Sequence, residues 1–167
     1  KHARPTGKLL TSLDMTFPDP AAPGGQVDWR RILQGVLPYV DVFMPNVEEL
    51  MFMLHRNLYE ELLQTTQQGS LLERVTPELL HEVSSEILDM GVKIIALKLG
   101  ERGLYLRTGD QNTLLPLVDN LDVVSWSDKE YWAPCFKVDV AGTTGAGDAT
   151  IAGFLSGLLR GLSPAET

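Results

Sequence analysis

One segment of the chain is apolar almost without interruption. Residues 92–99 read Val-Lys-Ile-Ile-Ala-Leu-Lys-Leu and are followed by Gly100. A short run of this kind is typical of a β-strand covered on both faces, which is the usual position of a strand in a parallel sheet. The segment therefore predicts a sheet with helices packed against both of its faces.

The rest of the sequence shows a matching alternation. Apolar residues recur at helical spacing in four segments: 27–37, 47–62, 76–91 and 145–160. Further strand-like segments are 8–17, 40–44, 104–108 and, interrupted by Pro116 and Pro134, 113–141. Strands that alternate with helices predict an α/β fold with a mostly parallel sheet. Such sheets bind ligands at the carboxyl ends of their strands.

The composition restricts the partners that we expect. The 167 residues are 44% apolar and 22% charged, which is ordinary for a globular domain and argues against disorder. The net charge is −8 and no cluster of Lys and Arg stands out, so neither a nucleic acid nor an anionic membrane is expected as a partner. The single cysteine, Cys135, rules out an internal disulfide framework and fits a reducing cytosol, so the predicted location is cytoplasmic.

The segment from Gly142 to Leu155 joins a loop of small residues to an apolar helix. The free N–H groups and the positive dipole end of a helix start can hold an anion, and side chains as small as those of 145–147 let a phosphate approach the backbone. Asp148 is the only carboxylate in the segment, and a carboxylate beside a phosphoryl acceptor can orient a hydroxyl and take its proton. The alternative is a glycine-rich turn in which Asp148 merely caps the helix.

Residues 143–148, Thr-Thr-Gly-Ala-Gly-Asp, with Ala152-Gly153 following, resemble the C-terminal signature of the ribokinase-like sugar kinases, also called the phosphofructokinase B family. The resemblance extends from about Lys8 to the end of the chain. It implies a three-layer ribokinase-like core and ATP-dependent phosphoryl transfer to a hydroxyl of a sugar or sugar-like substrate. By this resemblance Asp148 is the catalytic base, and the backbone of Gly145, Ala146 and Gly147 forms the anion hole. The nucleotide-binding part of the signature is assigned to Thr143 and Thr144.

Two further motifs agree with the resemblance. Residues 46–49, Asn-Val-Glu-Glu, match the family's Asn-x-x-Glu motif, which implies that Asn46 serves the nucleotide site and Glu49 the Mg²⁺. From the residues alone, Asn46 is equally a helix N-cap with Glu49 as the capping glutamate. The second motif, 98–103, resembles the family's nucleotide-contacting strand-turn, and the residues assigned to ATP there are Lys98, Gly100 and Gly103. Its alternative is an ordinary hairpin turn with a solvated lysine.

One departure from the family pattern lies at Gly142, where many members carry an aspartate that helps to form a monovalent-cation site; activation by K⁺ is therefore doubtful. The closing residues, 163–167, read as a helix start with Ser163 as N-cap. We therefore take residues 1–167 as the C-terminal catalytic part of a longer kinase domain, without its N-terminal substrate and lid part and its final helices. A homodimer would form through that lid, and the isolated fragment is expected to be inactive.

Two other functions stay open at this stage. One is a catalytically silent nucleotide- or sugar-binding regulatory protein, against which an intact Asp148 and its glycine loop argue. The other is the same fold acting on a nucleoside or a vitamin alcohol. Asp14, at the end of a strand, is either a site residue or a turn contact. Surface or packing roles are expected for His55 and His81, and Cys135 is expected to be a small packing residue and not a catalytic thiol. Three aromatic residues are expected to bury a face of the sheet, or alternatively to line a base pocket: Trp126, Tyr131 and Trp132.

Overall fold

The computed structural model describes residues 9–65, 71–115, 117 and 120–167. Its centre is a five-stranded sheet in the order β1-β2-β3-β4-β5. The strands are β1 (Ser12–Leu13), β2 (Val42–Phe43), β3 (Ile94–Lys98), β4 (Leu104–Thr108) and β5 (Glu130–Ala133). The first three are parallel to one another, β4 is antiparallel to β3, and β5 is antiparallel to β4, so four of the five point the same way. The predicted α/β fold with a mostly parallel sheet is confirmed.

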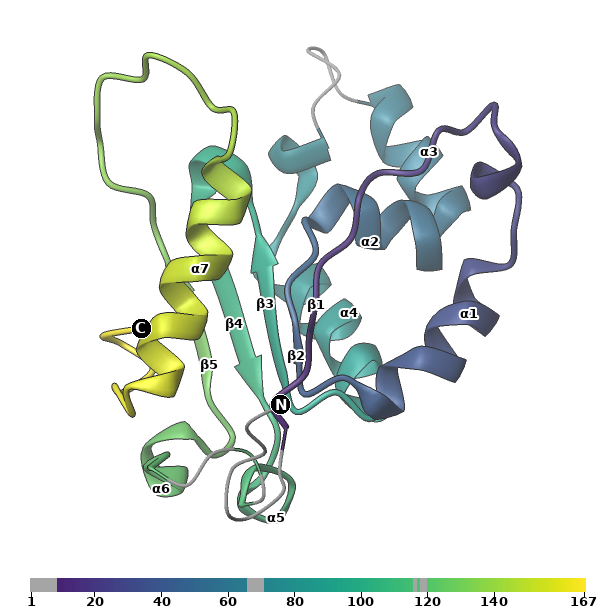
Figure 1. Cartoon of the computed structure of the whole chain (residues 1–167). Helices are drawn as coiled ribbons and strands as arrows, with labels where there is room; N and C mark the ends of the chain where they lie inside the picture. Colours follow the sequence, from purple (N-terminus) through teal and green to yellow (C-terminus); the bar gives the residue numbers. More distant parts are fainter. Residues whose placement is uncertain (1–8, 66–70, 116, 118–119) are drawn as a thin grey trace.

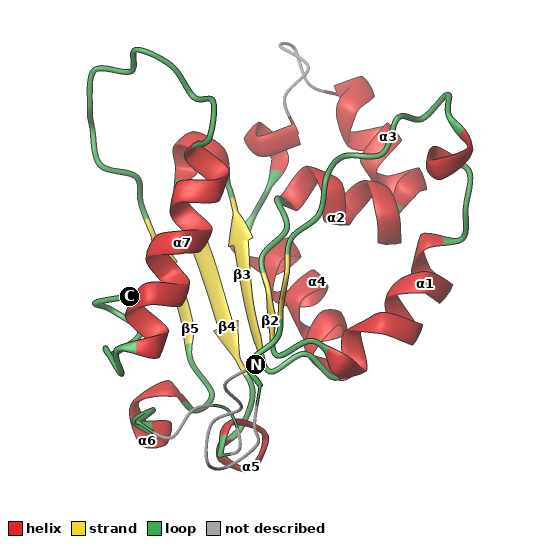
Figure 2. Cartoon of the chain, viewed as in Figure 1, coloured by secondary structure: helices red, strands yellow, loops and turns green. Residues whose placement is uncertain are grey.

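Helices cover both faces of this sheet, as Figures 1 and 2 show. The helices are α1 (Trp29–Val36), α2 (Val47–Leu54), α3 (Arg56–Thr65), α4 (Pro77–Asp89), α5 (Gln111–Leu114), α6 (Val123–Trp126) and α7 (Ala146–Leu159). The first four lie on one side of the sheet, and α5, α6 and α7 lie on the other. The result is the expected three-layer arrangement.

The central strand shows why the sheet is buried on both faces. Ile95 and Leu97 pack into the cluster formed with α1, α2 and α4, whereas Ile94 and Ala96 pack into the cluster formed with α5, α6 and α7. All four side chains are fully buried. Because successive side chains of a strand point to opposite faces, a strand covered on both sides must be apolar at every position.

Two elements differ in extent from the sequence prediction. The helix predicted at 47–62 is two helices, because the backbone of His55 (φ −131°, ψ 50°) leaves the helical region between α2 and α3. The ring of His55 bonds the carboxylate of Glu86 on α4 at 2.7 Å, which ties the break to the neighbouring helix. The strand predicted at 8–17, whose residue 8 lies outside the described residues, is reduced to the two residues of β1.

The strand-like reading of 113–141 is wrong over most of its described length. It holds one strand, β5, preceded by the short helix α6, and α5 overlaps its first residues. Each of these helices is capped by an aspartate: the Asp110 carboxylate accepts from the N–H of Thr113 at 2.8 Å, and that of Asp122 accepts from the N–H of Ser125 at 3.3 Å. These N-caps outweighed the β-branched residues that follow them. Pro116 lies outside the described residues.

After β5 the chain runs over the surface to α7, as the loop at the top left of Figure 1 shows. Residues 133–150 are all exposed, among them Cys135, whose predicted packing role is therefore wrong. At the other end of α7, the side chain of Glu166 accepts from the N–H of Ser163 at 3.1 Å, so a single turn forms where the sequence predicts a helix start.

The aromatic residues of this region divide between core and surface. Trp126 is fully buried against Phe154 of α7, as expected of a residue that covers the sheet. Trp132 is half-buried and lies under the guanidinium of Arg102, 4.6 Å from the ring centroid. Tyr131 is exposed, so its predicted burial against the sheet is wrong. No helix in the described ranges is both long and apolar enough to cross a membrane.

Candidate functional site

The carboxyl ends of the first three strands bring polar residues from distant parts of the chain to one edge of the sheet. Asp14 follows β1, Asn46 follows β2, and Lys98 is the last residue of β3. The N–H of Lys98 donates to the carbonyl of Pro45 at 3.0 Å, and a parallel bridge joins Asn46 to Lys98. The start of α7 lies at the same edge (Figure 1). This is the edge at which parallel sheets bind ligands.

Lys98 is the basic residue at the centre of this edge. Its ammonium donates to the carboxylate of Asp14 at 2.6 Å, with 15% of the lysine side chain and 33% of the aspartate side chain exposed. A β-carbon added to Gly147 would lie 3.8 Å from the ammonium nitrogen. The lysine therefore lies directly beside the first turn of α7.

Asn46 and Glu49 form a complete capping box at the start of α2. The Asn46 side chain accepts from the N–H of Glu49 at 2.7 Å, and the Glu49 carboxylate accepts from the N–H of Asn46 at 2.9 Å. Glu49 is buried, and burial raises the pKa of its carboxyl group, although the Asn46 N–H and the charge of Lys98 act in the opposite direction. Asn46 and Glu49 therefore have the helix-capping role that the sequence left open for this motif. This capping role is compatible with a further role at the site.

The first turn of α7 offers unpaired donors to solvent. Gly145 is the N-cap, with a φ of +79° that favours glycine. The N–H of Ala146 is already bonded to the Thr143 carbonyl at 3.0 Å. In contrast, the N–H groups of Gly147 and Asp148 have no hydrogen-bond partner among the described residues. They are the open amides that a helix start presents to an anion. Of the residues predicted for the anion hole, Ala146 has its N–H bonded within the chain, whereas no partner for the N–H of Gly145 or Gly147 lies among the described residues.

Asp148 is exposed in this first turn, as are Thr143 and Thr144 in the loop before it. No hydrogen bond or ion pair engages the Asp148 carboxylate within the described part of the chain. The carboxylate is therefore accessible to solvent next to the open amides.

The turn after β3 is shaped by its glycines. Gly100 and Gly103 both have positive φ, +54° and +96°, and the N–H of Leu99 closes the turn on the Gly103 carbonyl at 2.8 Å. A β-carbon on Gly103 would lie 2.0 Å from the Ala133 carbonyl oxygen, so this glycine lets β4 approach β5. The structure thus brings together Asp14, Lys98, Asn46, Glu49 and the start of α7, whereas Gly103 faces the sheet.

The pairing of Asp14 with Lys98 is the contact that sequence reasoning missed. The two residues are 84 positions apart, and nothing in their local sequence signals the pair. A polar residue at the end of each of two parallel strands is the one available signal, because those ends share an edge.

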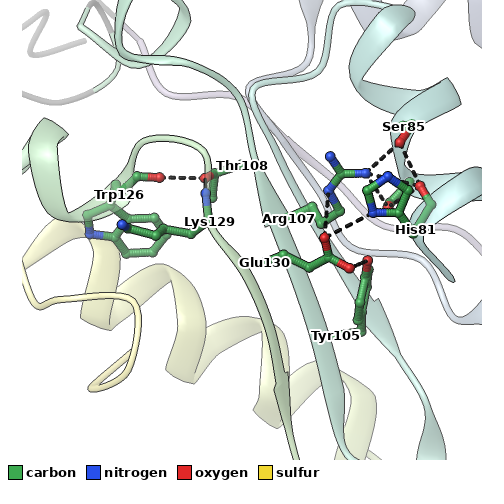
Figure 3. A network of polar contacts seen from close by, with 9 residues as sticks. His81, Ser85, Tyr105, Arg107, Thr108, Trp126, Lys129 and Glu130 are labelled. Carbon is green, nitrogen blue, oxygen red and sulfur yellow. Dashed lines mark hydrogen bonds and ion pairs between the residues drawn. The ribbon is translucent and has the colours of Figure 1, made fainter. Parts of the chain in front are cut away.

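Both helical histidines take part in braces between elements. His55 bonds Glu86, as described above, and His81 of α4 contacts the carboxylate of Glu130 on β5 at 3.0 Å (Figure 3). The Tyr105 hydroxyl donates to the same carboxylate at 2.6 Å, and this bond is the main reason why the pKa of Glu130 is lowered. Across the described ranges there is no group of three or more His, Cys, Asp or Glu side chains able to hold a metal ion by themselves.

Comparison with known proteins agrees with this arrangement. The model of the pfkB family of carbohydrate kinases matches residues 2–167, so the chain belongs to that family. An uncharacterized sugar kinase from Archaeoglobus fulgidus is 27% identical over 157 residues, which cover 92% of this chain and 45% of the relative. The chain thus spans less than half the length of this relative.

Solved structures share the fold. The ribokinase of Thermotoga maritima matches with a TM-score of 0.54 and 22% identity, over 94% of this chain and 38% of that one. A PfkB protein from Polaromonas matches with a TM-score of 0.53 and 20% identity, over 92% and 36%. The Arabidopsis thaliana ribokinase, solved with ribose and ATP, matches with a TM-score of 0.51 and 22% identity, over 80% and 32%. The expected ribokinase-like core is confirmed.

Proposed function

We propose that the protein that carries this chain transfers the γ-phosphoryl group of ATP to a hydroxyl of a sugar or a sugar-like alcohol. One observation carries the proposal: the ammonium of Lys98 lies beside Gly147, in a helical turn that offers the open amides of Gly147 and Asp148 and an accessible carboxylate. Membership of a family of carbohydrate kinases supports the same chemistry.

The proposed reaction follows from the charges at this edge. The acceptor oxygen attacks the γ-phosphorus, the bond from that phosphorus to the β,γ-bridging oxygen breaks, and ADP leaves with the electron pair. Asp148 accepts the proton of the attacking hydroxyl and aligns its oxygen. Because the transition states of phosphoryl transfer are loose, the proton is lost late, and alignment matters more than the strength of the base.

The negative charge of the transferred group is met by fixed donors. The N–H groups of Gly147 and Asp148 and the dipole of α7 point toward it, and Lys98 adds a full positive charge at the same place. These groups are in position before the substrate binds, so little reorganisation accompanies the reaction. Removal of one such donor typically costs about 10²–10³ in rate.

The residues present also fit Mg²⁺. One oxygen of the Glu49 carboxylate accepts the Asn46 N–H, and the other has no hydrogen-bond partner in the described ranges. Mg²⁺ prefers oxygen ligands and usually binds through one or two carboxylates, waters and substrate phosphates, which agrees with the absence of a larger ligand cluster among the described residues. Glu49 would hold the ion, which supplies charge neutralisation on the phosphates when bound.

The variant Asp148→Asn tests the proposal in the intact protein. The amide keeps the size of the side chain but does not accept the proton, so we expect turnover to fall by about 10²–10⁴ while ATP affinity is retained. Turnover is measured by coupled detection of ADP, and ATP affinity by calorimetry. Turnover like that of the wild type would remove Asp148 from the mechanism.

A matched control is Glu78→Gln. Glu78 is also an exposed acid in the first turn of a helix, α4, but this helix lies on the opposite face of the sheet from α7. Both substitutions remove a favourable charge from a helix start. Only Asp148→Asn should reduce turnover. A panel of sugars, nucleosides and vitamin alcohols then identifies the acceptor, and failure to phosphorylate any of them would favour a silent binding protein.

A further inference from the structure

Two lysines flank β3, and each is paired with an aspartate. Lys93 directly precedes the strand and donates to Asp41, whose carboxylate also accepts from the N–H of Thr11. Lys98 ends the strand and donates to Asp14. The first pair lies at the amino end of β3, away from the site, and the second lies at the carboxyl end, beside the start of α7.

We propose that Asp14 is a positioning residue of the phosphoryl-transfer site, which holds the ammonium of Lys98 in front of the first turn of α7. The inference rests on the proposed function. Its geometric basis is the 2.6 Å bond from Lys98 to Asp14 together with the 3.8 Å from the Lys98 nitrogen to the place of a β-carbon on Gly147.

A lysine without a partner would be a poor phosphate ligand at this position. Its four-carbon stem has large rotamer freedom, which is lost when the ammonium binds a substrate. With Asp14 in place, the side chain of Lys98 loses this freedom when the protein folds and not when the substrate binds. An ammonium has three donors, so the bond to Asp14 leaves two for phosphate oxygens.

The charge of Asp14 acts in the opposite direction on binding. A carboxylate beside a polyphosphate repels it, and Glu49, which feels the charges of both Lys98 and Asp14, adds to the negative charge of this edge. Removal of Asp14 should therefore leave ATP binding unchanged or tighter, while the misplaced Lys98 slows the reaction. A fall in kcat without a rise in KM is the signature of this role.

If the pair of Asp14 and Lys98 had a purely structural role, its loss would act through the stability of the protein. The Asp14 side chain is one-third exposed, and exposed ion pairs contribute little to stability. We therefore expect Asp14→Ala to leave the melting temperature of the intact protein almost unchanged. A loss of activity through unfolding would lower the melting temperature and reduce the active fraction.

The test is a double-mutant cycle in the intact protein with Asp14→Ala, Lys98→Ala and both together. We expect Asp14→Ala to lower kcat by roughly tenfold to a hundredfold, the size of effect that a small misplacement of a catalytic group produces. In the Lys98→Ala background the same change should have no further effect, because Asp14 acts through Lys98. An unchanged kcat in Asp14→Ala, or losses that multiply, would overturn the proposal.

Lys93→Ala is the matched control. It breaks a lysine–aspartate pair at the other end of the same strand, so it reports what the loss of such a pair does to the sheet alone. Asp41 keeps its bonds to Thr11 in this variant. We expect kcat to stay at the wild-type value. A fall like that of Asp14→Ala would assign the effect to the sheet and overturn the proposal.

A second readout needs no turnover. An amine-acylating reagent labels the lysines of the nucleotide-free protein, and mass spectrometry gives the rate at each site. Because the Asp14 carboxylate shields the ammonium of Lys98, we expect Asp14→Ala to raise the labelling rate of Lys98 several-fold and to leave that of Lys93 unchanged. An unchanged rate at Lys98 in a protein that transfers phosphoryl groups refutes the role of Asp14 alone. A wild-type protein that transfers none refutes the proposed function and this role together.

Discussion

The substitution Gly147→Ala separates what the fold needs from what the site needs. Gly147 lies in the first turn of α7, and its φ is not in the left-handed region. The nearest atom to an added β-carbon is the Lys98 nitrogen at 3.8 Å, an ordinary van der Waals distance. The fold therefore has room for alanine.

The magnitudes have opposite signs. Alanine is favoured over glycine within a helix by up to about 1 kcal/mol, so the free energy of unfolding should stay equal or rise by that amount. The methyl group, however, occupies the space between the open amide and Lys98 that a phosphoryl oxygen must enter. We expect kcat/KM to fall at least about tenfold, or about 1.4 kcal/mol of transition-state stabilisation, and by as much as 10²–10³ if the donor is lost completely.

Urea unfolding and a coupled ADP assay on the same preparation measure both effects. Gly35→Ala is the control, because Gly35 lies in α1, is exposed and has no atom within 4 Å of an added β-carbon. Gly35→Ala should raise the free energy of unfolding by about as much as Gly147→Ala does, without any change in activity. Full activity in Gly147→Ala would refute the placement of the phosphoryl group, and a clear loss of stability would refute the assignment of free space.

Two further substitutions test the structure away from the amides. Gly103→Ala should destabilise the protein by more than the roughly 1–3 kcal/mol of backbone strain alone, because its β-carbon would also meet the Ala133 carbonyl oxygen at 2.0 Å. A loss of stability below about 1 kcal/mol in urea unfolding would contradict this prediction. Tyr105→Phe removes the bond that lowers the pKa of Glu130. Because the pKa of Glu130 in the folded state is lower than its ordinary value of 4.5, the ionised carboxylate stabilises the fold above pH 4.5. This stabilisation is lost as the pH falls through the folded-state pKa. The loss of stability caused by Tyr105→Phe should thus be largest at neutral pH and should shrink below pH 4.5. We expect about 1 kcal/mol, because the bond is made to a carboxylate whose side chain is 42% exposed. A loss of stability that is independent of pH would contradict the assignment.

Several elements were predictable because their signals are local. Thr76 caps α4 by accepting from the N–H of Leu79, and Gly91 follows the helix with a φ of +104°, as the sequence pattern predicts. The uninterrupted apolar run of β3 predicts its burial on both faces. The glycine loop before Asp148 predicts the helix start of α7. In each case the residues that determine the element lie within a few positions of one another.

Elements decided by distant contacts were not predictable in the same way. The apolar spacing of 47–62 continues through His55, and the break between α2 and α3 is accompanied by contacts with distant elements: His55 bonds Glu86 of α4, and the Leu54 carbonyl accepts from Arg30 of α1 at 3.2 Å. Cys135 has neighbours that favour packing, yet it lies in an exposed loop. The length of β1 depends on how far β2 runs beside it, which no pattern within 8–17 contains.

By itself the sequence determined the fold class and the small-residue helix start with its carboxylate, because periodicity, N-caps and the steric freedom of glycine act over a few neighbouring residues. The tertiary structure alone decided which charges meet there. Asp14 and Lys98 come into contact only because two parallel strands end at the same edge of the sheet, and Lys98 reaches Gly147 only because α7 packs across that sheet. Such contacts depend on the register and packing of whole elements, and no local pattern records them.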